Sequence, residues 1–170
     1  MGSASIVGQQ VSVAGGGTLA ARVVQRHGTP VPGLGELGLT HTFPSPTTLA
    51  AADLAGLGFT SSRATAIRNF ACAVADDTIR LDRSVGLDQL VASVTAVPGL
   101  GPWTAHYLAL RLGESDAFPA ADLGLRRAVE PVSPPSTSEL TQLAERWRPW
   151  RALAAVHLWL SERAAASVLV

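Results

Sequence analysis

Apolar residues recur at helical spacing through most of this chain, and glycine or proline separates one such stretch from the next. The first stretch is "SIVGQQVSVAGGGTLAARVVQRHG", where an interruption is expected at Gly15 to Gly17 because each glycine inside a helix costs roughly 1 kcal/mol relative to alanine. Alternating runs of β-branched residues are nearly absent. The sequence therefore predicts an all-α fold of about seven to nine helices.

Helix start and stop signals divide the rest of the chain. The further helices are expected at residues 47–54, 60–77, 86–97, 102–113, 122–129, 136–147 and 149–166. Ser136 and Glu139 have the spacing of a capping box, and Pro149 is expected in the first turn of the last helix. Residues 29–47 are rich in Gly and Pro and predict a surface connection.

Length and composition favour a single soluble domain. The chain has 170 residues, of which 47% are hydrophobic and 15% charged, enough for a substantial core. Its 13 basic and 13 acidic residues cancel, which argues against nucleic-acid binding by bulk charge but allows a local basic face. No apolar run reaches the ~18 residues of a membrane span, and no secretion signal is present, so we expect a cytoplasmic protein without a membrane partner.

Two missing residue types limit the possible chemistry. All 13 basic residues are arginines, so no lysine amine can form a Schiff base. Cys72 is the single cysteine, which excludes an intrachain disulfide and a four-cysteine zinc or iron–sulfur site. His106 and His157 have no second ligand at metal-binding spacing, so a transition-metal site is not expected.

The turn "VPGLGP" at about residues 97–102 lies between two expected helices. Glycines there allow positive φ and a close approach of another backbone, and amides at the start of the second helix attract phosphate. The same glycines would also suit an ordinary turn between two helices that binds no ligand. Trp103 and Tyr107 follow at i, i+4 spacing, which is more typical of a core than of a pocket. Asp122 comes next and is well suited to be a helix N-cap.

Together these segments resemble the helix-hairpin-helix (HhH-GPD) DNA glycosylases, most closely the 3-methyladenine DNA glycosylase II branch. The resemblance covers nearly the whole chain. It is carried by four segments: "GQQVSV", "PGLGPWTAHYLALR", "FPAADLGLRRAV" and "AERWRPWRALAAVHLW". It implies one helix-hairpin-helix domain over residues 1–170, without the N-terminal α/β domain that usually precedes "GQQVSV" in that branch.

The resemblance also implies a function, namely hydrolysis of the N-glycosidic bond of alkylated purines in double-stranded DNA by a monomer. It assigns Asp122 as the catalytic carboxylate, which stabilises positive charge near C1′ and orients water. Trp103, Tyr107 and Trp159 would form the pocket for the flipped base, because electron-rich rings attract a cationic alkylated base.

Further contacts follow from the same resemblance. DNA would be bound by Gly99, Gly101, Thr104 and Gln10, the last standing where some members have a leucine wedge. No cofactor is required, although backbone carbonyls of the hairpin could hold a monovalent cation. The carbonyls implied are those of Thr95, Val97 and Leu100.

Bifunctional members have a lysine where this chain has Trp103, so hydrolysis without lysine-based strand cleavage is expected. The alternatives are a DNA-binding module without catalysis and a glycosylase for deaminated or oxidised bases. Among the remaining polar and aromatic residues, Glu114 and Asp116 are interpreted as solvated charges, and Trp147 and Trp150 as packing residues. Four arginines could contact phosphates or line a solvated helix face: Arg126, Arg127, Arg148 and Arg151.

Overall fold

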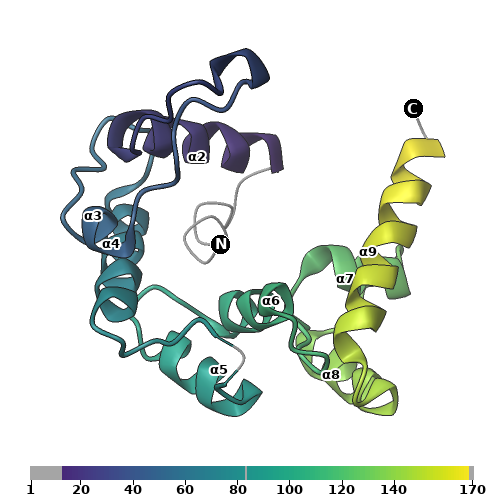
Figure 1. Ribbon diagram of the computed structural model, residues 1–170. Coiled ribbons are helices and arrows are strands. Elements are labelled where there is room, and N and C mark those ends of the chain that lie inside the picture. Colours follow the sequence, from purple (N-terminus) through teal and green to yellow (C-terminus); the bar gives the residue numbers. More distant parts are fainter. Residues whose placement is uncertain (1–12, 83, 169–170) are drawn as a thin grey trace. The chain divides into compact units, whose positions relative to one another are not determined.

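The computed structural model describes residues 13–82 and 84–168. Within these residues the chain forms eight α-helices, two short 3-10 helices and one isolated β-bridge between Pro30 and His41 (Figure 1). The predicted all-α fold is confirmed. None of the helices in the described ranges is long and apolar enough to cross a membrane.

The chain divides into two compact units. The first consists of Met1–Leu81 and Ser93–Leu100, and the second of Asp82–Ala92 and Gly101–Val170. Helix α5 (Leu87–Thr95) contributes to both units, and α6 (Pro102–Leu112) begins the second stretch of the second unit.

The first unit contains α2 (Val13–His27), α3 (Pro46–Ala50) and α4 (Ser61–Ala75). Their N-termini include two side-chain caps, Ser45 at α3 and Thr60 at α4. The expected interruption in the first helix is wrong, because α2 is continuous through its glycines. The core of this unit is formed by apolar side chains from all three helices and the turns between them: Leu19, Val23, Leu49, Leu54, Leu57, Ile67 and Phe70.

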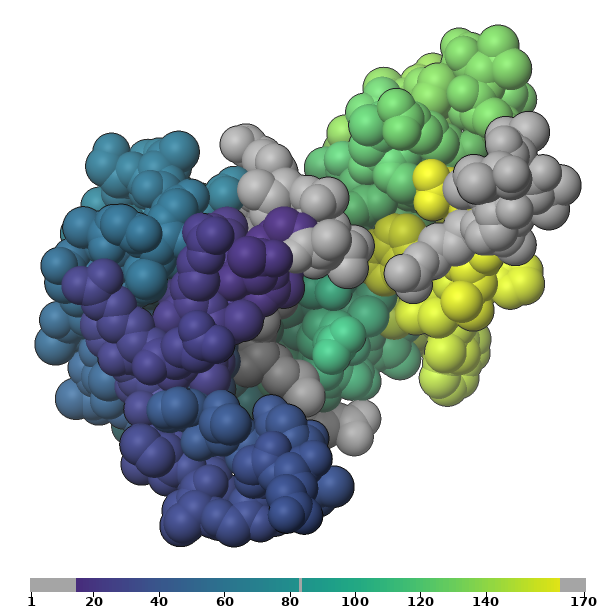
Figure 2. Space-filling model, turned by 90° about the horizontal axis from the view of Figure 1, so that it is seen from above, coloured from purple at the N-terminus to yellow at the C-terminus, as the bar shows by residue number. Residues whose placement is uncertain are grey.

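The predicted surface connection after α2 is confirmed for residues 29–45. It carries the 3-10 helix η1 (Gly35–Leu37) and projects from the rest of the first unit (Figures 1 and 2). Leu37 is 73% exposed and Leu39 is 57% exposed, so the connection buries little apolar surface.

The second unit contains α6, α7 (Leu123–Val129), α8 (Thr137–Ala144), η2 (Glu145–Trp147) and α9 (Arg151–Val168). The capping box of Ser136 and Glu139 is confirmed at the start of α8. Helix α9 begins at Arg151, so Pro149 precedes it and is not in its first turn. Helices α7 and α9 pack side by side, around a core that is formed by Phe118, Leu125, Leu140, Ala144 and Ala155.

Candidate active site

Helix α6 supplies two aromatic side chains to the second unit. Pro102 is its first residue, and Gly101 is an N-cap without a side-chain hydrogen bond. The four-residue spacing of Trp103 and Tyr107 places both rings on one face of the helix. The rings stack with 5.2 Å between centroids and an angle of 8° between planes, and both residues are half-buried.

Asp122 is the N-cap of α7, where its Oδ1 accepts a hydrogen bond from the Leu125 amide at 3.0 Å. The cap role that the sequence favours is therefore present. The same carboxylate has two further donors from distant parts of the chain. Trp103 Nε1 donates to Oδ2 at 2.9 Å, and Trp159 Nε1 of α9 donates to Oδ1 at 3.0 Å. The structure thus brings Asp122 together with the predicted pocket aromatics.

These bonds leave the two oxygens of Asp122 unequal. A carboxylate oxygen accepts about two hydrogen bonds. Oδ1 already accepts two, from Leu125 and Trp159, whereas Oδ2 accepts one, from Trp103. Oδ2 therefore keeps one acceptor position for a water molecule or for a positive charge. Both indoles fix the carboxylate plane, which favours a preorganised charge.

Trp159 completes the aromatic group around this carboxylate. Its ring meets Tyr107 edge-on, with 5.9 Å between centroids and an angle of 69°. Such edge-to-face pairs are worth about 0.5–1.5 kcal/mol beyond their buried area. Since all three aromatic residues of the group are half-buried, the rings are neither a closed core nor a free surface.

The segment before Asp122 is bonded to α6 through His106. The Phe118 amide donates to His106 Nδ1 at 3.3 Å, which places the proton of the neutral ring on Nε2. Burial lowers the pKa of His106 below its ordinary value, and the nearby Arg151 charge lowers it further. Asp88 and Asp116 oppose this shift. His106 thus supports the segment as an uncharged acceptor.

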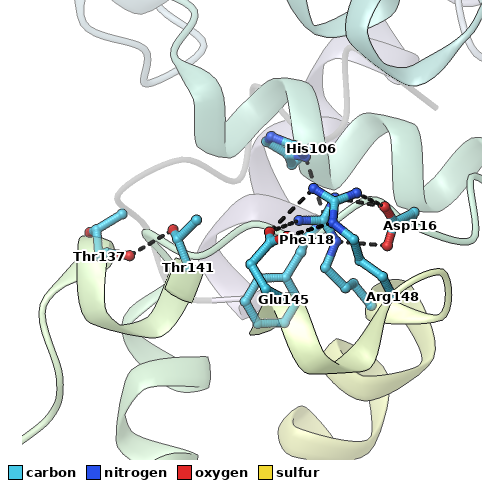
Figure 3. A network of polar contacts seen from close by, with 8 residues as sticks. His106, Asp116, Phe118, Thr137, Thr141, Glu145 and Arg148 are labelled. Atoms are coloured by element: carbon cyan, nitrogen blue, oxygen red, sulfur yellow. Dashed lines mark hydrogen bonds and ion pairs between the residues drawn. The ribbon is translucent and has the colours of Figure 1, made fainter. Parts of the chain in front are cut away.

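The same segment is joined to the start of α9 by a group of charged residues (Figure 3). Arg151 binds Asp116 through two bonds, Nε to Oδ1 at 2.7 Å and Nη2 to Oδ2 at 2.8 Å. Arg148 also binds Asp116, and both arginines bind Glu145. The Arg151 side chain is 8% exposed and that of Asp116 is 20% exposed. The interpretation of Asp116 as a solvated charge is therefore wrong.

This pairing bears on the two interpretations of Arg148 and Arg151, as phosphate contacts or as solvated charges on a helix face. Both guanidinium groups bind carboxylates within the unit, so neither lies unpaired on a solvated helix face, and Arg151 is too buried to meet a phosphate. Arg126 binds the Pro135 carbonyl, while Arg127 is exposed.

The turn residues differ in what the fold requires of them. Gly99 has a φ of +90°, and a β-carbon there would lie 2.9 Å from Ala66 Cβ. Both the backbone conformation and the packing of the first unit therefore require glycine at this position. Gly101 has a φ of −109°, and a β-carbon would meet nothing within 4 Å. A larger residue at Gly101 would therefore cause no backbone strain. Thr104 is 2% exposed, so in this structure its side chain is out of reach of a DNA strand.

Other predicted residues have mixed outcomes. Gln10 lies outside the described residues. Trp147 packs edge-on against Phe118 at 5.8 Å, as expected, but Trp150 is 59% exposed and is not a packing residue. Among the side chains described, no group of three or more His, Cys, Asp or Glu residues could hold a metal ion.

Comparison with known proteins assigns the family. Residues 3–151 match the HhH-GPD superfamily of base excision DNA repair proteins. The chain belongs to this superfamily.

Individual relatives agree with this assignment. A Mycobacterium tuberculosis protein, "Probable bifunctional transcriptional activator/DNA repair enzyme AlkA", is 41% identical over 91% of this chain and 32% of its own length. "DNA-3-methyladenine glycosylase 2" of Escherichia coli is 35% identical over 95% of this chain and 56% of its own length. The solved 3-methyladenine DNA glycosylase of Archaeoglobus fulgidus is 28% identical, with a TM-score of 0.80, over 95% of this chain and 57% of that one. This chain thus spans between a third and somewhat more than half of these relatives.

Some residues that shape the site carried no signal in the sequence analysis. Asp116 and Arg151 are 35 positions apart, so no local spacing relates them. His106 was considered only as a possible metal ligand, although its position between Trp103 and Tyr107 on α6 could have indicated a role near the pocket. The half-buried Gly124 in the first turn of α7 was also missed.

Proposed function

We propose that this domain is a monofunctional DNA glycosylase that releases alkylated purines of the 3-methyladenine and 7-methylguanine type from double-stranded DNA. The observation that supports it most is the Asp122 carboxylate, oriented by two indole donors and bordered by three aromatic rings. The relatives from Escherichia coli and Archaeoglobus fulgidus are 3-methyladenine DNA glycosylases, which points the same way.

The chemistry needs little more than this group. A purine alkylated at N3 or N7 carries a positive charge, so it leaves as a neutral base when the C1′–N bond breaks and takes the electron pair. Positive charge then develops on the sugar, and the carboxylate stabilises it electrostatically. The water oxygen forms the new bond to C1′, and its proton passes to Asp122 and then to solvent. Release of the base leaves an abasic sugar.

Base selection would rest on the aromatic residues. A cationic ring stacked on Trp or Tyr gains about 0.5–2 kcal/mol over a neutral one. In the described structure Trp103 and Tyr107 stack on each other, so a flipped base would contact the outer faces or edges of this aromatic group. Absence of lysine supports hydrolysis without a covalent imine, since no side-chain amine is available to attack C1′.

DNA binding would involve the turn at residues 97–102. Glycine at 101 is not required by space or by φ, which leaves the approach of a phosphate as a reason for its small size.

The carbonyls of Thr95, Val97 and Leu100 would hold a monovalent cation next to that phosphate. Val97 fits this role, because its carbonyl accepts one bond, from the Leu100 amide at 3.1 Å, and has a second lone pair. Oxygen ligands suit such a hard cation.

The test compares base release by the parent, Asp122→Asn and the exposed control Asp53→Asn on methylated duplex DNA. Asparagine keeps the helix cap but removes the charge, so we expect excision of 3-methyladenine to fall about 100-fold or more while DNA binding persists. The control should match the parent. Activity of Asp122→Asn above about a tenth of the parent, a barrier change below about 1.4 kcal/mol, would refute the assigned role.

Two further measurements in the same assay separate the alternatives. A parent protein that binds duplex DNA but releases no base is a binding module. Faster release of hypoxanthine or 8-oxoguanine than of 3-methyladenine would assign a different substrate class. Borohydride added during turnover should trap no protein–DNA adduct, and a stable adduct would contradict the hydrolytic mechanism.

A further inference from the structure

Gly124 occupies the first turn of α7, two residues after Asp122, and is half-buried. Its φ is not among the positive values of this chain, so its backbone conformation is open to any residue. Glycine is also a poorer helix former than alanine. Neither backbone geometry nor helix propensity therefore explains a glycine at this position.

The surroundings of Gly124 supply a reason. A β-carbon at this position would lie 3.0 Å from Asp122 Oδ1, 3.5 Å from Trp159 Cδ1 and 3.7 Å from Trp159 Nε1. Carbon–oxygen contacts are ordinarily about 3.3–3.6 Å, so the contact with Oδ1 is too short. Oδ1 and Trp159 Nε1 are the two atoms of one hydrogen bond. An added methyl group would thus press on the bond that orients the carboxylate.

Neither partner of this bond can move without consequence. Oδ1 also accepts the Leu125 amide, so a shift of the carboxylate weakens the cap of α7. Trp159 is packed against the core of the second unit and against the edge of Tyr107. Because a carboxylate is planar, rotation at Oδ1 also moves Oδ2, which has the unused acceptor position.

We propose that Gly124 is a positioning residue, whose lack of a side chain leaves Asp122 Oδ1 free to accept the Trp159 indole and thereby sets the direction of Oδ2. This proposal rests on the function proposed above for Asp122. It makes residue 124 a size-sensitive position of the site, acting through the Asp122 carboxylate rather than by touching the substrate.

The test is Gly124→Ala, with Gly17→Ala as a matched control. Gly17 is also helical, and a β-carbon there would meet nothing within 4 Å. We expect kcat for 3-methyladenine release to fall at least about 10-fold in Gly124→Ala, with KM changed less than about 3-fold. Its melting temperature should change by less than about 4 °C, because the helix propensity of alanine offsets the weakened cap, whereas that of the control should stay equal or rise. A loss of activity in proportion to a loss of folded protein would refute the proposal.

A measurement without DNA decides the same point. The indole N–H signals of the tryptophans, assigned by single Trp→Phe variants, report each ring separately in a ¹H–¹⁵N spectrum. The Trp159 signal should move in Gly124→Ala, while that of the exposed Trp150 should not. In a Trp159→Phe background the added alanine should change kcat less than about 2-fold, because the bond between Oδ1 and the indole, which the methyl group would disturb, is already absent. An unmoved Trp159 signal or a full, additive loss in that background would overturn the positioning role.

These outcomes are distinguishable from failure of the proposed function. If the parent releases no alkylated base, the function fails, and the position of the Trp159 signal still decides whether Gly124 keeps the bond between the indole and Oδ1 in place.

Discussion

The charged group at the start of α9 predicts an unequal response to loss of its two least exposed members, Asp116 and Arg151. If Asp116 is replaced by alanine, Arg151 keeps a single bond, at 3.1 Å, to Glu145, whose side chain is 51% exposed. A buried cation then lacks a matched partner, which typically costs about 3–5 kcal/mol. If Arg151 is replaced by methionine, Asp116 still binds Arg148, and the new side chain fills the space of the old one. The loss should then be about 1–3 kcal/mol.

The assay is urea unfolding followed by circular dichroism at pH 7, for the parent, Asp116→Ala, Arg151→Met and the double variant. Both losses are measurable, and a thermal melt can check them, because in a chain of this size 1 kcal/mol corresponds to about 2–4 °C in melting temperature. The double variant should be more stable than Asp116→Ala alone, because it no longer buries an unpaired charge. Arg26→Met is the control, since the Arg26–Asp53 pair is 3.9 Å long and exposed, and its loss should change stability by less than about 1 kcal/mol.

Two results would refute this reasoning. One is equal destabilisation by the two single substitutions, which would mean that Arg148 does not compensate for Arg151. The other is a double variant that is less stable than Asp116→Ala, which would mean that the buried guanidinium contributes mainly through packing of its aliphatic chain.

Three predictions concern other parts of the chain. Folding lowers the pKa of His106, so below about pH 6.5 the unfolded chain binds more protons than the folded chain. The free energy of unfolding should therefore decrease as the pH falls from about 6.5 toward the pKa of His106 in the folded chain. His106→Asn keeps an acceptor that cannot be protonated and should flatten this decline in urea unfolding at pH 7.5 to 5, whereas parallel curves would contradict the role. At the turn, Gly101→Asp and Gly101→Asn should both keep the melting temperature, since both residues cap helices well, but only the aspartate should strongly weaken duplex binding, by repelling phosphate. Gly99→Ala should cost about 1–3 kcal/mol in thermal melts because of its positive φ, and an unchanged melt would contradict this.

The fold was predictable where local chemistry decides it. Thr60 and Ser136 cap the helices that their positions predict, and Gly113, with a φ of +93°, ends α6 where glycine was expected. Prediction failed where packing outweighs propensity. Helix α2 continues through its three glycines, and it buries Leu19 and Val23 beyond them.

The site was predictable to the same extent. The i, i+4 spacing of Trp103 and Tyr107 and the cap position of Asp122 are local features, and the structure contains both. Trp159 was associated with them only through resemblance to a family, because 37 residues separate it from Asp122. The indole–carboxylate bonds could not be predicted, since they depend on how α6, α7 and α9 pack.

These observations converge on the segment between α6 and α7, which has no regular structure of its own and yet carries Asp122. It is bonded to α6 through His106, to α9 through Arg151 and through the Ala152 amide, which donates to the Ser115 carbonyl at 2.9 Å, and to the core through Phe118. A carboxylate that acts by electrostatic stabilisation must stay in place while charge develops, because reorientation during the reaction would cancel much of the gain. A loop fixed on three sides, followed by a short helix that Asp122 itself caps, meets that requirement. Substitutions in this segment far from any substrate should therefore lower kcat more than they raise KM.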